Sequence, residues 1–227
     1  MNFKTAKSAE TFERVLAAAG TLFRRKGFAG ATMRELASES QLGLGALYYY
    51  FRSKEELVLV FYERINQQSL LLFQEQTSRD LAGAMGDFLQ LKLQLLTPHR
   101  DLMRVIMKEA IDPESPLCPL NPAAAAPLNL SLGVFSEMTA RFEGLQGRAQ
   151  TERARMLWLI HMAVLGYWLH DRSPNYKATL STLGTLASFL KLSSLALKIP
   201  GMRGFQTRLS GHISDLFDGP GGNNDTG

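Results

Sequence analysis

The stretch from Thr32 to Lys54 constrains the fold of this 227-residue chain more than any other part of it. It reads TMRELASESQLGLGALYYYFRSK, and Thr32 and Glu35 have capping-box spacing, which predicts a helix that starts directly after Thr32. The segment Gln41-Leu42-Gly43 interrupts the helical pattern. The first half of the stretch is therefore predicted to be one short helix that ends in a tight turn.

A second short helix is predicted over residues 44–51, because Leu47 and Phe51 are four positions apart and form an inward face. Tyr48 and Tyr49 lie beside that face and present hydrogen-bonding side chains to the outside. Two short helices joined by a glycine-containing turn are typical of the helix-turn-helix motif. The second helix of that motif enters the major groove of DNA.

The letters around this motif resemble one protein family in particular. The run L-x-Y-Y-Y-F-R-S-K-E-E-L, preceded by T-M-R-E-L-A, is similar to the DNA-binding domain of the TetR family of transcriptional regulators. The resemblance extends over residues 11–57. It implies an all-α protein with an N-terminal three-helix helix-turn-helix domain, followed by a helical ligand-binding and dimerisation bundle.

The same resemblance implies roles for individual side chains. Tyr48 and Lys54 fall where the family contacts DNA phosphates, and Thr32 falls where the first helix of the motif meets the DNA backbone. Tyr49 falls where the family reaches base edges or thymine methyl groups. The predicted DNA-binding residues are Thr32, Arg34, Leu44, Gly45, Ala46, Tyr48, Tyr49 and Lys54.

The turn departs from the usual family pattern Gly-Val-Ser-Lys-Gly-Thr, because this chain has the residues QLGLGA at 41–46. Gly43 replaces the Ser that caps the second helix, and Gly is a tolerable N-cap, so we expect the helix to form. Leu44 and Ala46 replace the Lys and Thr that would contact DNA. Two polar contacts of the family are therefore missing here.

Positive charge is concentrated near the motif. Residues 1–54 contain nine Lys and Arg against four Glu, a net charge of +5, whereas the whole chain carries +4. The remaining residues therefore carry −1. An excess of cations beside the motif favours attraction to DNA phosphates, although a solvated helical surface would show a similar excess.

The remainder of the chain has helical periodicity and no convincing strand. Helices are predicted over residues 8 or 11 to 26, 54–79, 80–96, 98–111, 128–145, 151–171, 177–198 and 204–217. The expected domains are residues 1–55 for DNA binding, 56–218 for ligand binding and dimerisation, and 219–227 as a flexible tail.

Two helices near the C-terminus predict a homodimer. The helix over 151–171 is apolar nearly all round, so it must be covered on every side. The helix over 177–198 is rich in Ala, Ser and Gly, which allow close helix approach. Such a pair suits a four-helix bundle made by two copies of the chain.

The resemblance to the TetR family implies a ligand pocket, which we expect among the helices over 98–111, 128–145 and 151–171, because these carry bulky apolar residues and few polar ones. This lining suits a small lipophilic or aromatic molecule, although core packing alone would also explain it. The predicted ligand-binding residues are Met103, Met107, Phe135, Met138, His161 and Leu165, with His161 as the polar anchor.

Residues 112–127 hold five of the nine prolines and are predicted to be a connecting loop. A loop this long in a compact domain is either functional or disordered. The two alternatives are a lid near a ligand entrance and plain disorder.

The sequence contains no motif that predicts a metal site, a cofactor or catalytic residues, so we do not expect an enzyme. Cys118 is the single cysteine, which rules out an internal disulfide. The N-terminus lacks the apolar core of a signal peptide, and the longest apolar run, 156–169, is too short to span a bilayer. A cytoplasmic protein is therefore expected.

Together with these patterns, the resemblance to the TetR family implies a repressor that binds palindromic operator DNA as a homodimer and is released by a small molecule. The alternative is an all-α small-molecule-binding protein or enzyme that retains a vestigial helix-turn-helix. The loss of polar residues at Leu44 and Ala46 supports the alternative.

Overall fold

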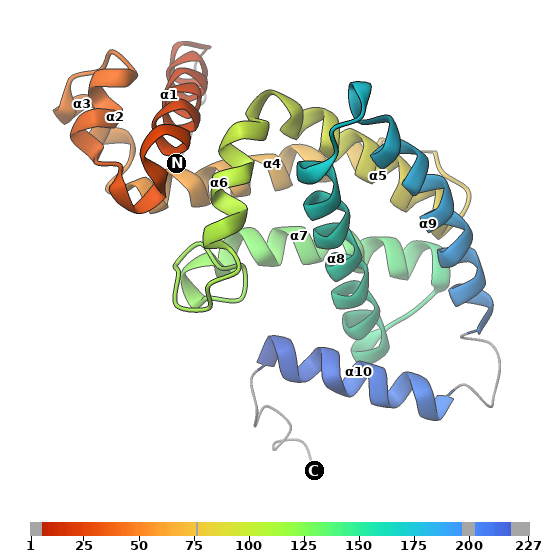
Figure 1. Cartoon of the computed structure of the whole chain (residues 1–227). Coiled ribbons are helices and arrows are strands. Elements are labelled where there is room, and N and C mark those ends of the chain that lie inside the picture. The colour runs from red at the N-terminus through yellow and green to blue at the C-terminus, as the bar shows by residue number, and fades with distance from the viewer. Residues whose placement is uncertain (1–5, 76, 197–202, 219–227) are drawn as a thin grey trace. The chain divides into compact units, whose positions relative to one another are not determined.

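The computed structural model describes residues 6–75, 77–196 and 203–218 (Figure 1). These residues form helices and contain no strand, which confirms the predicted all-α class. The α-helices are α1 (Ala6–Gly30), α2 (Met33–Glu39), α3 (Leu44–Tyr50), α4 (Lys54–Gln74), α5 (Leu81–Leu96), α6 (Arg100–Glu109), α7 (Ala125–Glu143), α8 (Gly147–His170), α9 (Lys177–Ala196) and α10 (Arg203–Asp218). The tail predicted over 219–227 lies outside the described residues. Within the described ranges, no helix is both long and apolar enough to cross a membrane.

The helices form two compact units, each made of two separate chain segments. The first unit contains residues 1–68 and 93–128, and the second contains residues 69–92 and 129–227. This division differs from the domain boundary expected after residue 55. The reason is that α6 packs along α1, although nearly eighty residues separate them in sequence. Periodicity within one helix does not reveal such a long-range contact.

The core of the first unit is built on the apolar stripe of α1. The stripe was predicted from helical spacing, and all of its members are buried: Phe12, Val15, Leu16, Ala19, Leu22 and Phe23. Phe12 contacts Phe51 from the end of α3, with ring centroids 6.0 Å apart. Gly27 interrupts α1 with a φ of 76°, a left-handed conformation that glycine adopts without steric cost. The helix that was predicted to end at residue 26 is thus interrupted at the next residue and continues to Gly30.

Residues 112–124 form four consecutive β-turns. Each turn has a hydrogen bond from the N–H of its fourth residue to the carbonyl of its first: Asp112–Ser115, Ser115–Cys118, Cys118–Asn121 and Asn121–Ala124. Proline occupies the second position of each turn, at 113, 116, 119 and 122, where its fixed φ suits the turn. The loop is therefore an ordered part of the first unit. A role as a lid remains a prediction.

Several helix boundaries differ from the predictions for local reasons. Helix α7 begins at Ala125 instead of residue 128, because Pro127 falls in its first turn, where the N–H needs no partner. Helix α4 ends at Gln74, five residues before the predicted end. Asp80 accepts a hydrogen bond from the N–H of Gly83, at 2.7 Å, and thereby caps the start of α5.

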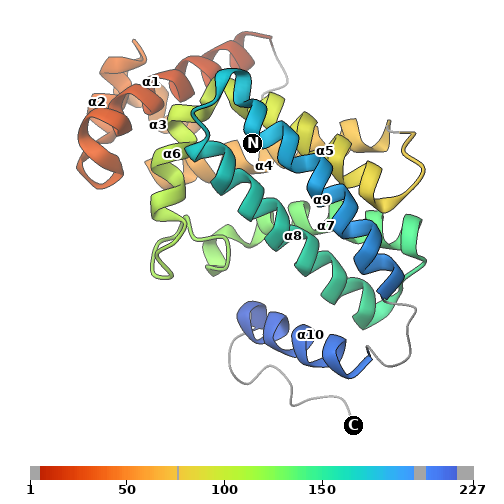
Figure 2. The same ribbon diagram turned by 45° about the vertical axis from the view of Figure 1, so that its right-hand side comes forward.

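In the second unit, α8 and α9 lie side by side, and α10 packs against α8 (Figure 2). The α8–α10 contact includes Trp158 and Phe217, whose ring centroids are 5.5 Å apart. At the corner between α8 and α9, the buried Asp171 carboxylate accepts hydrogen bonds from the hydroxyl and N–H of Thr179 and the N–H of Ser173. These bonds lower the pKa of Asp171 below its ordinary value, the Thr179 side chain contributing most.

Candidate DNA-binding surface

The first helix of the motif, α2, begins at a complete capping box. The Glu35 N–H donates to the Thr32 hydroxyl at 3.2 Å, and the Thr32 N–H donates to the Glu35 carboxylate at 3.1 Å. This arrangement confirms the prediction made from the spacing of the two residues. Lys26 also donates to Glu35, and with Thr32 it holds the pKa of Glu35 below its usual range.

The turn between the two motif helices is a Schellman motif with an unusual residue in its left-handed position. The N–H of Leu42 donates to the carbonyl of Ala37 at 2.9 Å, and the N–H of Gln41 donates to the carbonyl of Ser38 at 3.1 Å. Gln41 has a φ of 54°, a conformation that glycine normally supplies. The buried Ser40 hydroxyl donates to the Leu36 carbonyl at 2.7 Å and holds the turn against the helix.

The second motif helix, α3, buries one face and exposes the other. Leu47 and the C-cap residue Phe51 are 0% and 1% exposed, as the sequence predicted. Tyr48 and Tyr49 are 49% and 80% exposed. Gly45 and Ala46 are also exposed, whereas Leu44 is half-buried. The outward face of α3 is thus uncharged, and it carries two phenol hydroxyls as its hydrogen-bonding groups.

Lys54 does not extend into solvent in this structure. Its ammonium donates to the carbonyls of Phe28, Ala29 and Ala31, at 2.6, 3.2 and 3.1 Å. It also lies 4.7 Å from the centroid of the Phe28 ring. Three carbonyls match the three donors of an ammonium group. The predicted phosphate contact of Lys54 must therefore compete with bonds that join the end of α1 to the start of α4.

Three basic side chains at the end of α1 are ion-paired. Arg25 pairs with Glu39 of α2 at 3.0 Å, Lys26 pairs with Glu35 of α2, and Arg24 pairs with Asp101 of α6. Cations near the C-terminal end of a helical segment are also favoured by the partial negative charge there. Their ion pairs show a further role, because each joins α1 to another helix of the first unit.

Two exposed arginines close to α3 have no ion-pair partner among the described residues. Arg34 lies in the first turn of α2, and it was predicted to bind DNA. Arg52 follows α3 directly and was missed, although the letters R-S-K after the aromatic run place a cation there. Thr32 is exposed beside them. Exposed cations thus lie on either side of α3 in the sequence, where they are available to phosphates.

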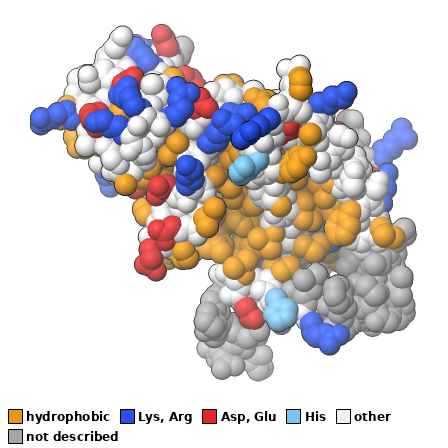
Figure 3. Space-filling view, in the orientation of Figure 1, with side chains coloured by type: hydrophobic (Ala, Val, Ile, Leu, Met, Phe, Trp, Pro, Cys, Tyr) orange, Lys and Arg blue, Asp and Glu red, His pale blue; other side chains and the backbone are white. Residues whose placement is uncertain are grey.

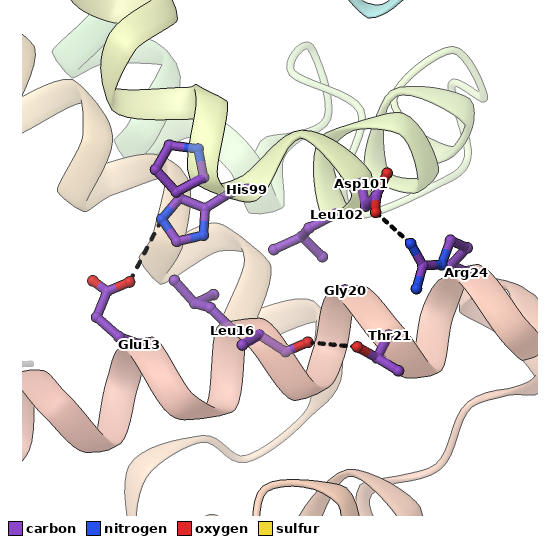
Figure 4. A pocket seen from close by; sticks show the side chains of 10 residues that line it. Glu13, Leu16, Gly20, Thr21, Arg24, His99, Asp101 and Leu102 are labelled. Atoms are coloured by element: carbon purple, nitrogen blue, oxygen red, sulfur yellow. Dashed lines mark hydrogen bonds and ion pairs between the residues drawn. The ribbon is translucent and has the colours of Figure 1, made fainter.

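A pocket of about 390 Å³ lies in the first unit between α1 and the start of α6 (Figure 4). The Glu13 carboxylate lies 3.5 Å from His99 at one end, and the Arg24–Asp101 ion pair lies at the other. Partial burial lowers the pKa of His99. Helices α1 and α6 are in contact here, because a β-carbon at residue 20 would lie 3.6 Å from the Leu102 side chain, an ordinary van der Waals distance. The position of α6 is therefore tied to α1.

The predicted ligand-binding residues are divided between the two units. Met103 is buried and Met107 is half-buried on α6, in the first unit. The second unit contains the other four, all buried: Phe135, Met138, His161 and Leu165. The structure brings Phe135 and His161 together, with ring centroids 5.5 Å apart.

A capped helix, a tight turn and an exposed second helix flanked by arginines define a protein of the helix-turn-helix class. Two family models match the chain: bacterial regulatory proteins of the tetR family over residues 15–60, and the tetracyclin repressor-like C-terminal domain over residues 85–184. The chain belongs to the TetR family of transcriptional regulators.

The curated relatives are described as HTH-type transcriptional regulators. The chain is 32% identical over 111 residues to the HTH-type regulator YerO of Bacillus subtilis, covering 47% of this chain and 38% of YerO. It is 29% identical over 106 residues to YttP of the same organism, covering 44% of this chain and 50% of YttP. The matches thus span half or less of the length of these relatives.

Solved structures share the fold at low sequence identity. The fatty acid degradation regulator FadR of Bacillus halodurans has a TM-score of 0.63 and 16% identity, covering 78% of this chain and 94% of FadR. FadR of Bacillus subtilis, in complex with stearoyl-CoA, has a TM-score of 0.61 and 15% identity, covering 77% and 97%. GusR of Salmonella enterica has a TM-score of 0.57 and 19% identity, covering 96% and 100%.

Proposed function

We propose that this regulator is a repressor that binds palindromic operator DNA as a homodimer and is released by a small lipophilic or aromatic molecule. The observation that carries the proposal is the exposed, uncharged face of α3, with Tyr48 and Tyr49 between Arg34 and Arg52. Arginines beside the motif would hold phosphates, and α3 would contact base edges in the major groove.

Two copies of α3 would contact successive major-groove faces about 34–36 Å apart, or a multiple of that distance. The test is fluorescence anisotropy with the promoter DNA of the chain's own gene at several salt concentrations. We expect the logarithm of the affinity to fall linearly with the logarithm of the salt concentration, because binding releases counterions from phosphates. Binding no tighter than to scrambled DNA would contradict the proposal.

The proposed dimer is supported by exposed apolar side chains on α8 and α9. These are Tyr167, Leu180, Phe189 and Leu192, which are 49%, 44%, 57% and 68% exposed. Hydrophobic side chains cluster over these helices in the space-filling view (Figure 3). Exposed apolar patches of this kind mark interaction surfaces. In a symmetric dimer, the patch on each chain would be buried against the same patch on the other chain.

The proposed ligand would bind in the second unit among α5, α7 and α8. Support comes from the buried apolar residues Phe135, Met138 and Leu165, with His161 as a polar group among them. The fold neighbour FadR of Bacillus subtilis was solved with stearoyl-CoA, whose stearoyl chain is lipophilic. A ligand can release the repressor only if it binds one conformer of the chain more tightly than another.

The second candidate function is that of an all-α small-molecule-binding protein or enzyme with a vestigial helix-turn-helix. The observation that favours it is that Leu44 and Ala46 offer no hydrogen bond to DNA. The promoter-binding experiment separates the two candidates, because a vestigial motif would give weak, sequence-independent binding.

A further inference from the structure

Three helices of the second unit place an aromatic cluster around a histidine. Phe88 of α5 and Phe135 of α7 have ring centroids 5.3 Å apart, and the two rings are nearly perpendicular, at 80°. The imidazole of His161, from α8, lies 6.1 Å from the Phe88 ring and 5.5 Å from the Phe135 ring, centroid to centroid. All three side chains are buried, at 1%, 0% and 3% exposure. The imidazole thus lies against two phenyl rings, away from solvent.

Neither ring nitrogen of His161 has a hydrogen-bond partner within the described part of the chain. A neutral imidazole carries one N–H that needs an acceptor and one bare nitrogen that needs a donor. Buried polar groups in proteins are nearly always hydrogen-bonded, and a group without a partner destabilises the fold. A histidine kept at such a position is therefore a candidate for a role in binding.

A serine hydroxyl in the same condition lies one helical turn from the cluster. Ser131 precedes Phe135 by four residues on α7, so both side chains project from the same face of that helix. Ser131 is 4% exposed, and its hydroxyl makes no hydrogen bond among the described residues. A hydroxyl can both donate and accept. Two buried polar side chains, from α7 and α8, thus seek partners beside the phenyl rings.

Both of these polar side chains are neutral near pH 7. Burial, together with the nearby Lys92, lowers the pKa of His161 well below its usual value. Lys92 itself holds its ammonium 5.7 Å from the centroid of the Phe88 ring and takes part in an interaction of its own. The groups that seek a partner are therefore uncharged. An uncharged polar group can pair with them without the free-energy cost of removing water from an ion among phenyl rings.

We infer that the second unit binds an uncharged aromatic molecule with a hydroxyl group, which bonds to His161 and Ser131 while its ring packs against Phe88 and Phe135. This inference rests on the proposed function, because it names the chemical class of the releasing ligand. A phenol hydroxyl donates to the bare imidazole nitrogen and accepts from the serine hydroxyl, so one group satisfies both side chains. The phenol ring would use the same edge-to-face packing that joins Phe88 to Phe135.

Binding of such a molecule would also change the conformation of the second unit. The rings of Phe88, Phe135 and His161 lie 5.3–6.1 Å apart, which is direct contact, so a ligand ring must displace at least one of them. These side chains belong to α5, α7 and α8, so the displacement acts on the packing of three helices. The ligand would favour the displaced conformer, because only there do His161 and Ser131 gain their partners.

The test compares two phenols with their own methyl ethers by isothermal titration calorimetry on the full chain at neutral pH. The phenols are 4-propylphenol and 2-naphthol, and 4-propylbenzoate is the charged analogue. An ether oxygen still accepts a hydrogen bond, but it cannot donate one to the imidazole nitrogen. We expect at least one phenol to bind about tenfold more tightly than its ether, because the ether leaves that nitrogen buried without a partner. The benzoate should bind more weakly than 4-propylphenol.

Three variants assign the preference to individual side chains. His161→Phe keeps a ring and removes both nitrogens, so it should bring phenol and ether to within about twofold of each other and raise the melting temperature of the protein alone. Ser131→Ala should weaken phenol and ether alike, because both oxygens accept from the serine hydroxyl. The matched control is His212→Phe, which replaces an exposed histidine of α10 in the same unit and should leave the preference unchanged. Circular dichroism verifies that each variant is folded.

The inference is overturned if neither phenol is preferred over its ether, if the preference survives His161→Phe, or if 4-propylbenzoate binds as tightly as 4-propylphenol. It is also overturned if His161→Phe lowers the melting temperature and neither phenol binds the wild-type protein, since the imidazole would then bond only to an internal water. Promoter binding by the protein alone is measured separately, so failure of this site is distinguishable from failure of the proposed function.

Discussion

Replacing Lys92 by methionine should stabilise the unliganded protein. Lys92 is 3% exposed, and burial lowers its pKa to about 7, whereas the pKa of a lysine in an unfolded chain is about 10.4. Each pKa unit corresponds to about 1.36 kcal/mol, so near pH 7 the buried ammonium costs on the order of 4 kcal/mol. Methionine has a similar length and no charge, so it removes this cost and keeps most of the packing.

The effect has a defined dependence on pH. Below pH 7, Lys92 is protonated in both the folded and the unfolded chain, and the full cost of burial is present. Between about pH 7 and pH 10.4, the unfolded chain binds the proton that the folded chain has released, so the stability of the wild-type protein rises with pH. The advantage of Lys92→Met should therefore be largest below pH 7 and disappear toward pH 10.4.

The assay is urea unfolding followed by circular dichroism, at one protein concentration because a dimer's stability depends on concentration. Wild type, Lys92→Met and the exposed-site control Lys177→Met are compared at pH 6, 7, 8 and 9. We expect the control to change the free energy of unfolding by less than about 0.5 kcal/mol at every pH. If Lys92→Met is no more stable than wild type at pH 6, or if its advantage is the same at pH 6 and pH 9, the reasoning about the buried ammonium is wrong.

Four further results are expected. Arg34→Ala should lower the salt slope of operator binding, measured by fluorescence anisotropy, by about one, and should leave the melting temperature, measured by calorimetry, unchanged. Lys54→Ala should lower both the salt slope and the melting temperature, because Lys54 also bonds to backbone carbonyls. Gly45→Ala should stabilise the unbound protein by up to about 1 kcal/mol, since its β-carbon would meet nothing within 4 Å, yet weaken operator binding by roughly an order of magnitude. Gly184→Glu, at an exposed position of α9, should give monomers in sedimentation velocity, and an intact dimer would place the interface elsewhere. Replacing operator thymines by uracil should weaken binding about fourfold for each methyl group that Tyr49 contacts, and no loss at any thymine would exclude this readout.

The sequence predicted those parts of the motif that depend on neighbouring residues. The Thr32–Glu35 capping box needs only residues three positions apart, and the burial of Leu47 and Phe51 follows from helical spacing. The left-handed Gln41 was not predicted, because such a position normally contains glycine, and Gly43 lies only two residues further on. The helices of the motif were therefore predictable from local interactions, whereas the backbone conformation of the turn was seen only in the structure.

Contacts between distant segments were not predictable in the same way. Lys54 was expected to contact a phosphate, yet its ammonium donates to carbonyls of residues 28, 29 and 31. No local pattern reveals a bond across more than twenty residues. By contrast, the turns over 112–124 could have been predicted, because proline recurs there at every third position and follows Asp, Ser, Cys or Asn. The spacing of three residues between these prolines matches neither the period of a helix nor that of a strand, so it indicates neither element.

Similarly, the division of the candidate ligand residues between two units could not be deduced from apolar spacing. Met103 and His161 both lie on apolar helix faces, and each spacing pattern is satisfied by burial in any core. The spacing also contains no information on hydrogen bonds, so the unpartnered nitrogens of His161 became visible only in the structure. The burial of Lys92 was not predicted, because a lysine normally faces solvent.

The interleaving of the two units limits how this regulator can exchange parts with its relatives. Residues 1–55 include the whole helix-turn-helix but omit α6, which covers one side of α1 through Leu102 and the Arg24–Asp101 ion pair. A chimera joined after residue 55 would therefore expose apolar surface of α1 unless the new partner supplied an equivalent helix. A graft that also transfers residues 93–128 keeps that helix and the proline turns. New DNA specificities are then more readily acquired by substitutions on α3 than by exchanging the N-terminal segment.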